Sequence, residues 1–113
     1  MKHWVSQSME MNQITSTVIE SACTVHTALG AGLLENTYAA CLKHELTKHG
    51  LRAISEVALP VVYDGVTIDL GYRLDLLVED TVIVELKAVS QIAPIHKMQL
   101  LTYLKLSRKP VGL

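Results

Sequence analysis

Cysteine is scarce in this chain of 113 residues, and nothing around it suggests a metal site. The two cysteines, Cys23 and Cys41, fall in predicted helices, without a Cys-x-x-Cys pattern or a Cys/His cluster nearby. We therefore expect both to be reduced, small and buried, as in a cytoplasmic protein. A structural zinc site is not expected.

Long apolar runs and several well-known functional motifs are also missing. No apolar run is long enough to span a bilayer, and residues 1–6 lack the apolar stretch of a signal peptide. We expect a cytoplasmic protein that does not bind membranes. The sequence contains no Ser or Cys nucleophile motif, no phosphate-binding glycine-rich loop, no repeat and no linker.

What the chain does contain is enough apolar residues for one core. Half of its residues are apolar, and its length suits a single domain over residues 1–113. Residues 1–85 carry 11 acidic and 5 basic residues, whereas residues 86–113 carry 5 basic residues and no acid. This basic end suits steering of a phosphate chain, but a solvated helix face explains the charge more simply. A strong nonspecific DNA binder is usually basic overall.

Two helices are predicted in the first half of the chain. Apolar residues recur at helical spacing over about residues 11–29, and Gly30 is a natural residue to end that helix. A second helix runs from residue 33 or 34 to residue 49, and Gly50 ends it. The apolar stripes are Ile14, Val18, Ala22, Val25 and Leu29 in the first helix, and Tyr38, Leu42 and Leu46 in the second.

The second half changes to strand-forming residues. Asp64-Gly65 is a strong hairpin turn, Pro60 indicates a strand edge or bulge, and Gly71 indicates a bend. Strands are predicted over residues 53–63, 66–78, 81–89 and from 110 on, with a helix over about 94–107 that carries Met98, Leu101 and Leu104. The order α-α-β-β-β-α-β indicates an α/β (α+β) protein. The last strand is cut short at residue 113, which leaves part of a sheet unpaired and favours pairing with a second copy.

The most informative residues are two acids and a lysine on neighbouring predicted strands. Alternation places Glu85 and Lys87 on one face and Leu86 on the other. A three-residue turn centred on Asp80 pairs Asp75 with Glu85, with their Cβ atoms roughly 5 Å apart. Like charges so placed repel each other, so the arrangement requires a cation.

Two interpretations of this set are possible from the residues alone. In the functional one, both carboxylates and the backbone carbonyl of Leu86 hold Mg²⁺ or Mn²⁺, and Lys87 activates water or stabilises the charge on phosphorus. In the other, this is a solvent-exposed sheet face with salt bridges, such as one from Arg73 to Glu85. The spacing favours the second, because Glu-x-Lys is common in strands.

Three further positions are candidates, each with an ordinary structural explanation. Gln99 and Tyr103 share a helix face and suit contact with a phosphate or with Lys87, or simply an amphipathic helix. Glu35, in the first turn of its helix, suits either a third metal ligand or the helix dipole. His26 suits a proton carrier, although a structural role near the glycine turn is favoured.

Taken together, these residues resemble a known family. Residues 25–38, Val-His-Thr-Ala-Leu-Gly-Ala-Gly-Leu-Leu-Glu-Asn-Thr-Tyr, resemble the defining motif of the GxxExxY proteins, with Gly32, Glu35 and Tyr38 at its named positions. Residues 72–75, 84–88 and 99–103 resemble the rest of that pattern. The resemblance covers the chain from about residue 14 to its end. The family is placed in the PD-(D/E)XK nuclease superfamily.

The resemblance implies a nuclease core, a mixed sheet flanked by helices with acids on adjacent central strands. Asp75 and Glu85 match its metal-binding acids, Lys87 its catalytic lysine, and Glu35 the acid from the preceding helix. Gln99 and Tyr103 match the Gln-x-x-x-Tyr motif of RecB-like nucleases. Two departures exist: no proline precedes Asp75, and the chain stops where similar proteins continue with another apolar strand.

The leading hypothesis is thus a Mg²⁺- or Mn²⁺-dependent nuclease that hydrolyses DNA. A second is a catalytically silent module that binds nucleic acid on a nuclease fold. A third is a partner-binding or oligomer-forming subunit, because of the short last strand and the apolar composition.

Overall fold

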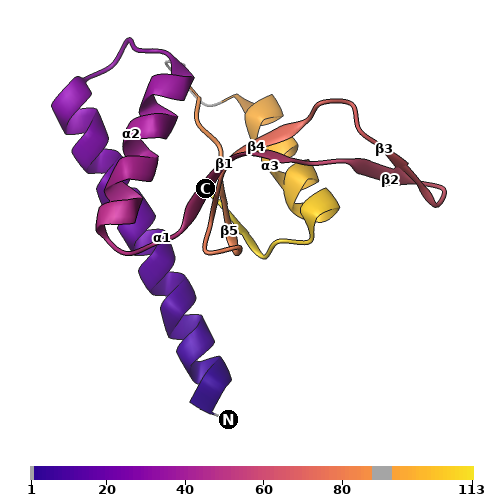
Figure 1. Cartoon of the computed structure of the whole chain (residues 1–113), viewed down its shortest axis with the longest axis horizontal. Coiled ribbons are helices and arrows are strands. Elements are labelled where there is room, and N and C mark those ends of the chain that lie inside the picture. The colour runs from indigo at the N-terminus through magenta and orange to yellow at the C-terminus, as the bar shows by residue number, and fades with distance from the viewer. Residues whose placement is uncertain (1, 88–92) are drawn as a thin grey trace.

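The computed structural model describes residues 2–87 and 93–113 as a mixed four-stranded sheet between two layers of helices (Figure 1). Helices α1 (Lys2–Leu29) and α2 (Glu35–Lys48) pack against each other on one side, and α3 (Pro94–Ser107) lies on the other. The described strands are β1 (Ala53–Ala58), β2 (Val61–Tyr63), β3 (Val66–Ile68), β4 (Arg73–Val78), β5 (Val82–Val84) and β6 (Val111–Gly112). This α+β architecture confirms the predicted fold class.

The sheet order is β1-β4-β5-β6, and its two faces bury different apolar clusters. Leu76 and Val78 pack toward α1 and α2, in a cluster with Leu42 and Leu46. Leu77 and Ile83 pack instead with residues of α3. Over residues 76–78 and 82–84, alternate side chains therefore pack against opposite helical layers, which explains why these segments are continuously apolar. Leu74 departs from this alternation, since it packs with Leu77 on the α3 side.

The β4–β5 hairpin has the predicted register. Its strands pair antiparallel, with Val78 opposite Val82 and Leu76 opposite Val84. The turn Glu79-Asp80-Thr81 is closed by the amide of Thr81, which donates to the carbonyl of Val78 at 3.0 Å. Beyond the turn, β6 pairs parallel to β5, and Lys109 contacts Asp80 at 2.9 Å.

Several boundaries differ from the predicted ones. Helix α1 begins at Lys2, earlier than expected, because the chain has no glycine or proline before Gly30. The two long predicted strands are each interrupted, at Leu59-Pro60 and around Gly71, so that four short strands result. Strand β5 ends at Val84, and residues 88 and 89 of the strand predicted over 81–89 lie outside the described residues.

The expectation that both cysteines are buried is wrong. Cys23 is exposed and not buried, because it lies on the solvent side of α1, away from Val18 and Val25; Cys41 is half-buried, and both are free thiols. On α3, Met98 and Leu101 are exposed. That helix packs on the sheet through Tyr103, with Leu100 and Leu104 beside it. None of the described helices is both long and apolar enough to cross a membrane.

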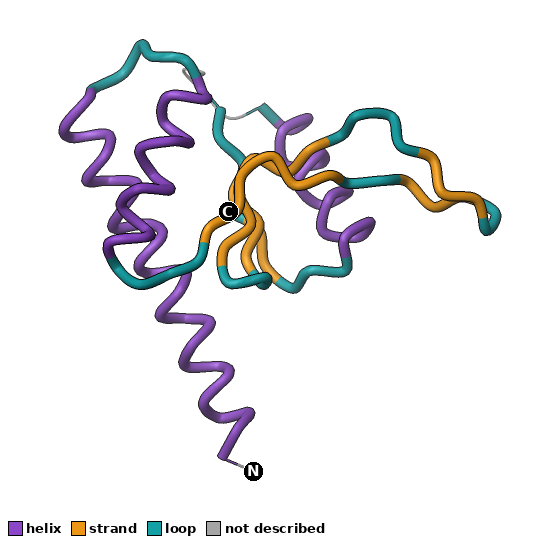
Figure 2. The backbone as a smooth tube through the Cα atoms, viewed as in Figure 1, coloured by secondary structure: helices purple, strands orange, loops and turns teal. Residues whose placement is uncertain are grey.

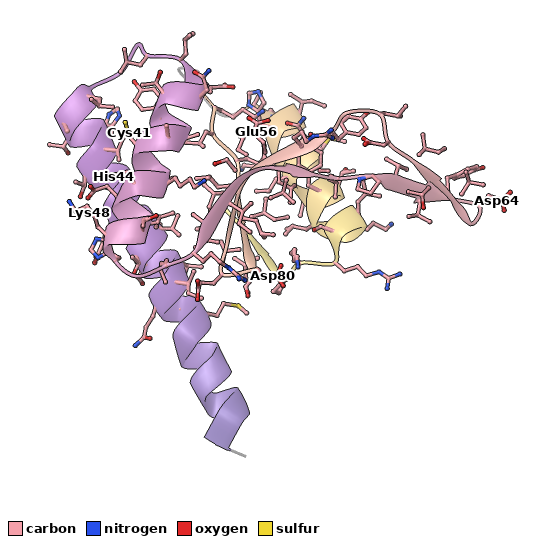
Figure 3. All side chains as sticks on the ribbon, in the orientation of Figure 1. Cys41, His44, Lys48, Glu56, Asp64 and Asp80 are labelled. Atoms are coloured by element: carbon pink, nitrogen blue, oxygen red, sulfur yellow. The ribbon has the colours of Figure 1, made fainter. Side chains whose placement is uncertain are left out.

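Strands β2 and β3 form a separate hairpin that projects from the body (Figure 2). Asp64 lies at its tip (Figure 3). Its apolar side chains are largely exposed, with Val62, Tyr63 and Val66 each more than half accessible. The two strands pair with each other from Val61–Ile68 to Tyr63–Val66.

One strand residue has a backbone conformation that favours glycine. Glu56 has φ of 56°, and the register of β1 on β4 places it opposite Asp75. We expect Glu56→Gly to raise the free energy of unfolding by about 1 kcal/mol, because glycine adopts positive φ without steric cost. Urea denaturation measures this. Glu56→Ala is the matched control, since it removes the charge but keeps Cβ, and an equal gain in that variant would assign the effect to charge instead.

Candidate active site

The acid pair lies where the β4–β5 ladder ends. Asp75 is in β4, and Glu85 is the first residue after β5. The amide of Asp75 donates to Glu85 Oε1 at 3.3 Å, and the amide of Leu86 donates to Asp75 Oδ2 at 2.8 Å. Each carboxylate thus bonds to the backbone of the opposite strand. The structure therefore brings together the two acids that the sequence pairs.

The electrostatics of this pair are unfavourable for two charges. Burial, and then the negative charge of Asp75, raise the pKa of Glu85 from 4.5 to about 7, while the positive charge of Lys87 acts in the opposite direction. The salt bridge from Arg73 to Glu85, expected for an ordinary exposed sheet face, is not formed, since Arg73 contacts Asp69 at 3.4 Å instead. The arrangement is a half-buried pair of carboxyl groups whose charged forms repel each other.

Helix α3 adds two polar side chains to the same face. Gln99 Nε2 donates to the hydroxyl of Tyr103 at 3.1 Å, and Tyr103 is buried. Burial, and then the negative charge of Glu85, raise the pKa of Tyr103, with a smaller effect of Asp75 in the same direction. Tyr103 therefore lies within electrostatic range of both acids. Tyr72 packs its ring against that of Tyr103, with centroids 6.4 Å apart.

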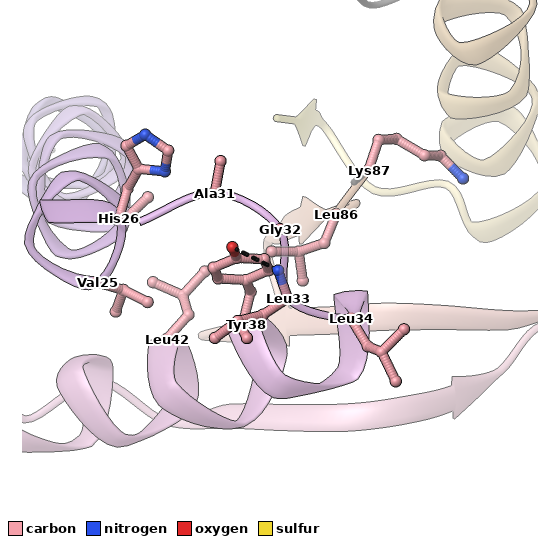
Figure 4. Close-up of a pocket in the computed structure, with 11 residues that line it drawn as sticks. Val25, His26, Ala31, Gly32, Leu33, Leu34, Tyr38, Leu42, Leu86 and Lys87 are labelled. Atoms are coloured by element: carbon pink, nitrogen blue, oxygen red, sulfur yellow. Dashed lines mark hydrogen bonds between the residues drawn. The ribbon is translucent and has the colours of Figure 1, made fainter. Parts of the chain in front are cut away.

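The segment after β5 divides its side chains between the two faces. Leu86 packs against the apolar cluster beneath α1 and α2, whereas Glu85 and Tyr103 act on each other on the α3 side. Lys87 is half-buried, and its ammonium group points toward the α3 side (Figure 4). The acids and the lysine are therefore neighbours, with Leu86 directed to the opposite face.

The Gly-x-Gly loop between α1 and α2 is held by a tyrosine. The hydroxyl of Tyr38 donates to the carbonyl of Gly30 and accepts from the amide of Leu33 at 3.1 Å. Gly30 and Gly32 both have positive φ, at 73° and 100°, a conformation that residues with Cβ rarely adopt. This explains why a tyrosine follows the glycines at this spacing, a role that the sequence alone did not reveal.

Glu35 and His26 lie in the layer of α1 and α2. Glu35 is the first residue of α2 and is exposed. The structure does not add it to the acid pair, since residues 2–87 and 93–113 contain no group of three or more His, Cys, Asp or Glu side chains that could hold a metal. Its part in metal binding stays a prediction. His26 lies at the last turn of α1 and lines a cavity beside the loop.

The donors present fit a hard divalent cation. Mg²⁺ is usually held by one or two carboxylates with substrate phosphate and water completing its shell, so two acids suffice. The two carboxylates lie close together, and burial and Asp75 raise the pKa of Glu85. A cation between them would offset this repulsion and lower that pKa. The carbonyl of Leu86 is a further oxygen donor in the same segment.

Comparison with known proteins gives one result. The model of the PD-(D/E)XK nuclease superfamily matches residues 12–113. The chain belongs to this superfamily, whose members are generally nucleases that hydrolyse their substrate. Searches among curated proteins and among solved structures found no match. The narrower resemblance to GxxExxY proteins stays a prediction.

The loop tyrosine generates a first prediction for this region. We expect Tyr38→Phe to lower the free energy of unfolding by roughly 1–2 kcal/mol, because the amide of Leu33 and the carbonyl of Gly30 lose their partner. Hydrogen exchange at the Leu33 amide should quicken in parallel. Tyr63→Phe on the exposed hairpin is the control and should change neither quantity; unchanged exchange at Leu33 in Tyr38→Phe would contradict the assigned role.

The acid pair generates a second prediction, for the metal-free protein. The pKa of Glu85 is about 7 in the folded state and 4.5 in the unfolded state. Between pH 4.5 and 7 the folded state therefore binds a proton that the unfolded state does not. Stability then falls as the pH rises from 4.5 to 7, by roughly 1–2 kcal/mol once solvent screening is allowed for. Urea denaturation across this range, compared with Glu85→Gln, isolates the effect. A wild-type slope that persists unchanged in Glu85→Gln would refute it.

Proposed function

We propose that this chain is a Mg²⁺- or Mn²⁺-dependent nuclease that hydrolyses phosphodiester bonds of DNA. The observation that carries the proposal is the reciprocal hydrogen bonding of Asp75 and Glu85, which fixes two carboxylates side by side at the end of a hairpin. Superfamily membership supports nuclease chemistry, and the basic residues 86–113 favour a phosphate-bearing substrate.

The residues have separable roles in this proposal. Asp75, Glu85 and the carbonyl of Leu86 would hold the cation, with Glu35 as a further candidate ligand. When bound, the cation polarises a phosphoryl oxygen and lowers the pKa of water. Lys87 supplies positive charge beside the attacked phosphate and helps to orient or deprotonate the attacking water.

Gln99 and Tyr103 position groups around the acids. Because the amide of Gln99 donates to the oxygen of Tyr103, the hydroxyl hydrogen of Tyr103 is available to a carboxylate or phosphate oxygen. Burial of the Tyr103 ring fixes where that hydrogen is offered. In this proposal Tyr103 donates a hydrogen bond to a carboxylate or phosphate oxygen, and the proton of the attacking water is taken up elsewhere.

The test is cleavage of labelled single- and double-stranded DNA, and of RNA, by the 113-residue chain with Mg²⁺ or Mn²⁺. Asp75→Asn, Glu85→Gln and Lys87→Met should each lower the rate by about 100-fold or more. Asp64→Asn at the hairpin tip and Lys43→Met, at an exposed position of α2 outside residues 86–113, are matched controls and should leave it unchanged.

Activity that survives loss of the acids, or a wild-type protein that cleaves nothing, would refute the proposal. Calorimetry separates the remaining hypotheses. Tight DNA binding without metal affinity would identify a silent nucleic-acid-binding module, and self-association without DNA binding would identify an oligomer-forming subunit.

A further inference from the structure

A cavity of about 680 Å³ lies between the α1–α2 loop and the segment after β5 (Figure 4). Three parts of the chain line it: α1 through residues such as Ala22 and His26, the loop and the start of α2, and the pair Leu86-Lys87. The volume is ample for one nucleoside-sized group. None of the proposed site residues except Leu86 and Lys87 contributes to it.

The cavity and the acid pair are joined through two consecutive residues, Leu86 and Lys87. The amide of Leu86 donates to Asp75 Oδ2, while its side chain forms part of the cavity wall. Lys87 also lines the cavity, and its ammonium group points away toward the α3 side, where its charge acts on Glu85. Because the side chain of Lys87 borders both the cavity and the acid pair, a ligand that places an anion at the acids and Lys87 can reach the cavity past that side chain.

The chemistry of the wall fits a flat, uncharged group next to that anion. Most lining residues are apolar, and neither aspartate nor glutamate is among them. The ring of Tyr38 is a fixed wall, because both hydrogen bonds of its hydroxyl run to the loop backbone. A nucleobase has the right shape, since bases stack on aromatic rings without regard to sequence. A paired and stacked base cannot enter such a cavity without leaving its duplex.

We propose that this cavity receives one unpaired nucleobase of the strand whose phosphate lies at Asp75 and Glu85. The substrate is then a single strand or a frayed end, and intact duplex is disfavoured. This inference rests on the proposed function and adds the structural class of its substrate.

The test fills the cavity without touching the acids. Ala22→Trp places an indole in it from α1, and Thr27→Trp, exposed on the same helix and outside the cavity, is the matched control. Fluorescence anisotropy of a labelled oligothymidylate with Ca²⁺, a hard cation that suits oxygen ligands, reads binding without relying on turnover. We expect roughly 10-fold weaker binding for Ala22→Trp and wild-type binding for Thr27→Trp.

A second ligand and a second variant make the result specific. Wild type should bind an oligonucleotide of abasic sites about as weakly as Ala22→Trp binds the intact one. Ala31→Trp, in the exposed loop, repeats the test from a position where packing of the helices is not disturbed, and circular dichroism verifies that each variant folds.

The outcomes separate this inference from the proposed function. Equal affinity of wild type and both cavity variants, or preferential cleavage of duplex, would overturn the base site while leaving the nuclease intact. Altered sedimentation of the variants with unchanged DNA binding would overturn it in favour of a protein segment in the cavity. A wild-type chain that neither binds nor cleaves nucleic acid would overturn both.

Discussion

The register of the β4–β5 hairpin is the constraint on which the site depends. Its turn is tight, with Glu79 and Asp80 both at positive φ, at 51° and 53°. This fixes Val78 opposite Val82, and counting outward brings Asp75 level with Glu85. A slip by one residue would send one acid to the other face of the sheet and break the apolar alternation as well. Core packing and the acid pair therefore enforce the same register.

The way the ladder ends gives this hairpin two different surfaces. After Val84, the carboxylate of Asp75 replaces a strand carbonyl as the acceptor for the amide of Leu86. The backbone stays near β4 while regular pairing stops. Glu85 is thereby directed toward α3 and Tyr103, and Leu86 toward α1 and α2. The hydrogen bond from the Leu86 amide to Asp75 thus directs Leu86 to the cavity and Glu85 to the α3 side, and Lys87 borders both.

Local patterns were sufficient to predict the α+β fold class, the register of the β4–β5 hairpin and the pairing of Asp75 with Glu85. These features depend on the residues of a turn and on strand alternation, which act over a few neighbouring residues. Such patterns do not decide which face of α3 is buried, because Met98 and Leu101 are as apolar as Leu100 and Leu104 and only the position of the sheet distinguishes them. The cavity could not be predicted either, since its walls come from residues 22–42 and from Leu86 and Lys87, more than forty residues later in the chain. The role of Tyr38 depends on a loop geometry that spacing does not encode.

Two departures from favourable local structure lie side by side at the acid pair. Asp75 and Glu85 repel each other in a half-buried setting, and Glu56, opposite Asp75 on β1, has a left-handed backbone. The remainder of β4 and β5 is apolar and closely packed. A sequence selected for stability alone would have placed apolar or oppositely charged residues here, so the strain is better explained by a ligand that offsets it. Under the proposed function, a divalent cation bound between the two acids would convert their repulsion into affinity, so that the same pair that weakens the free fold would strengthen the complex.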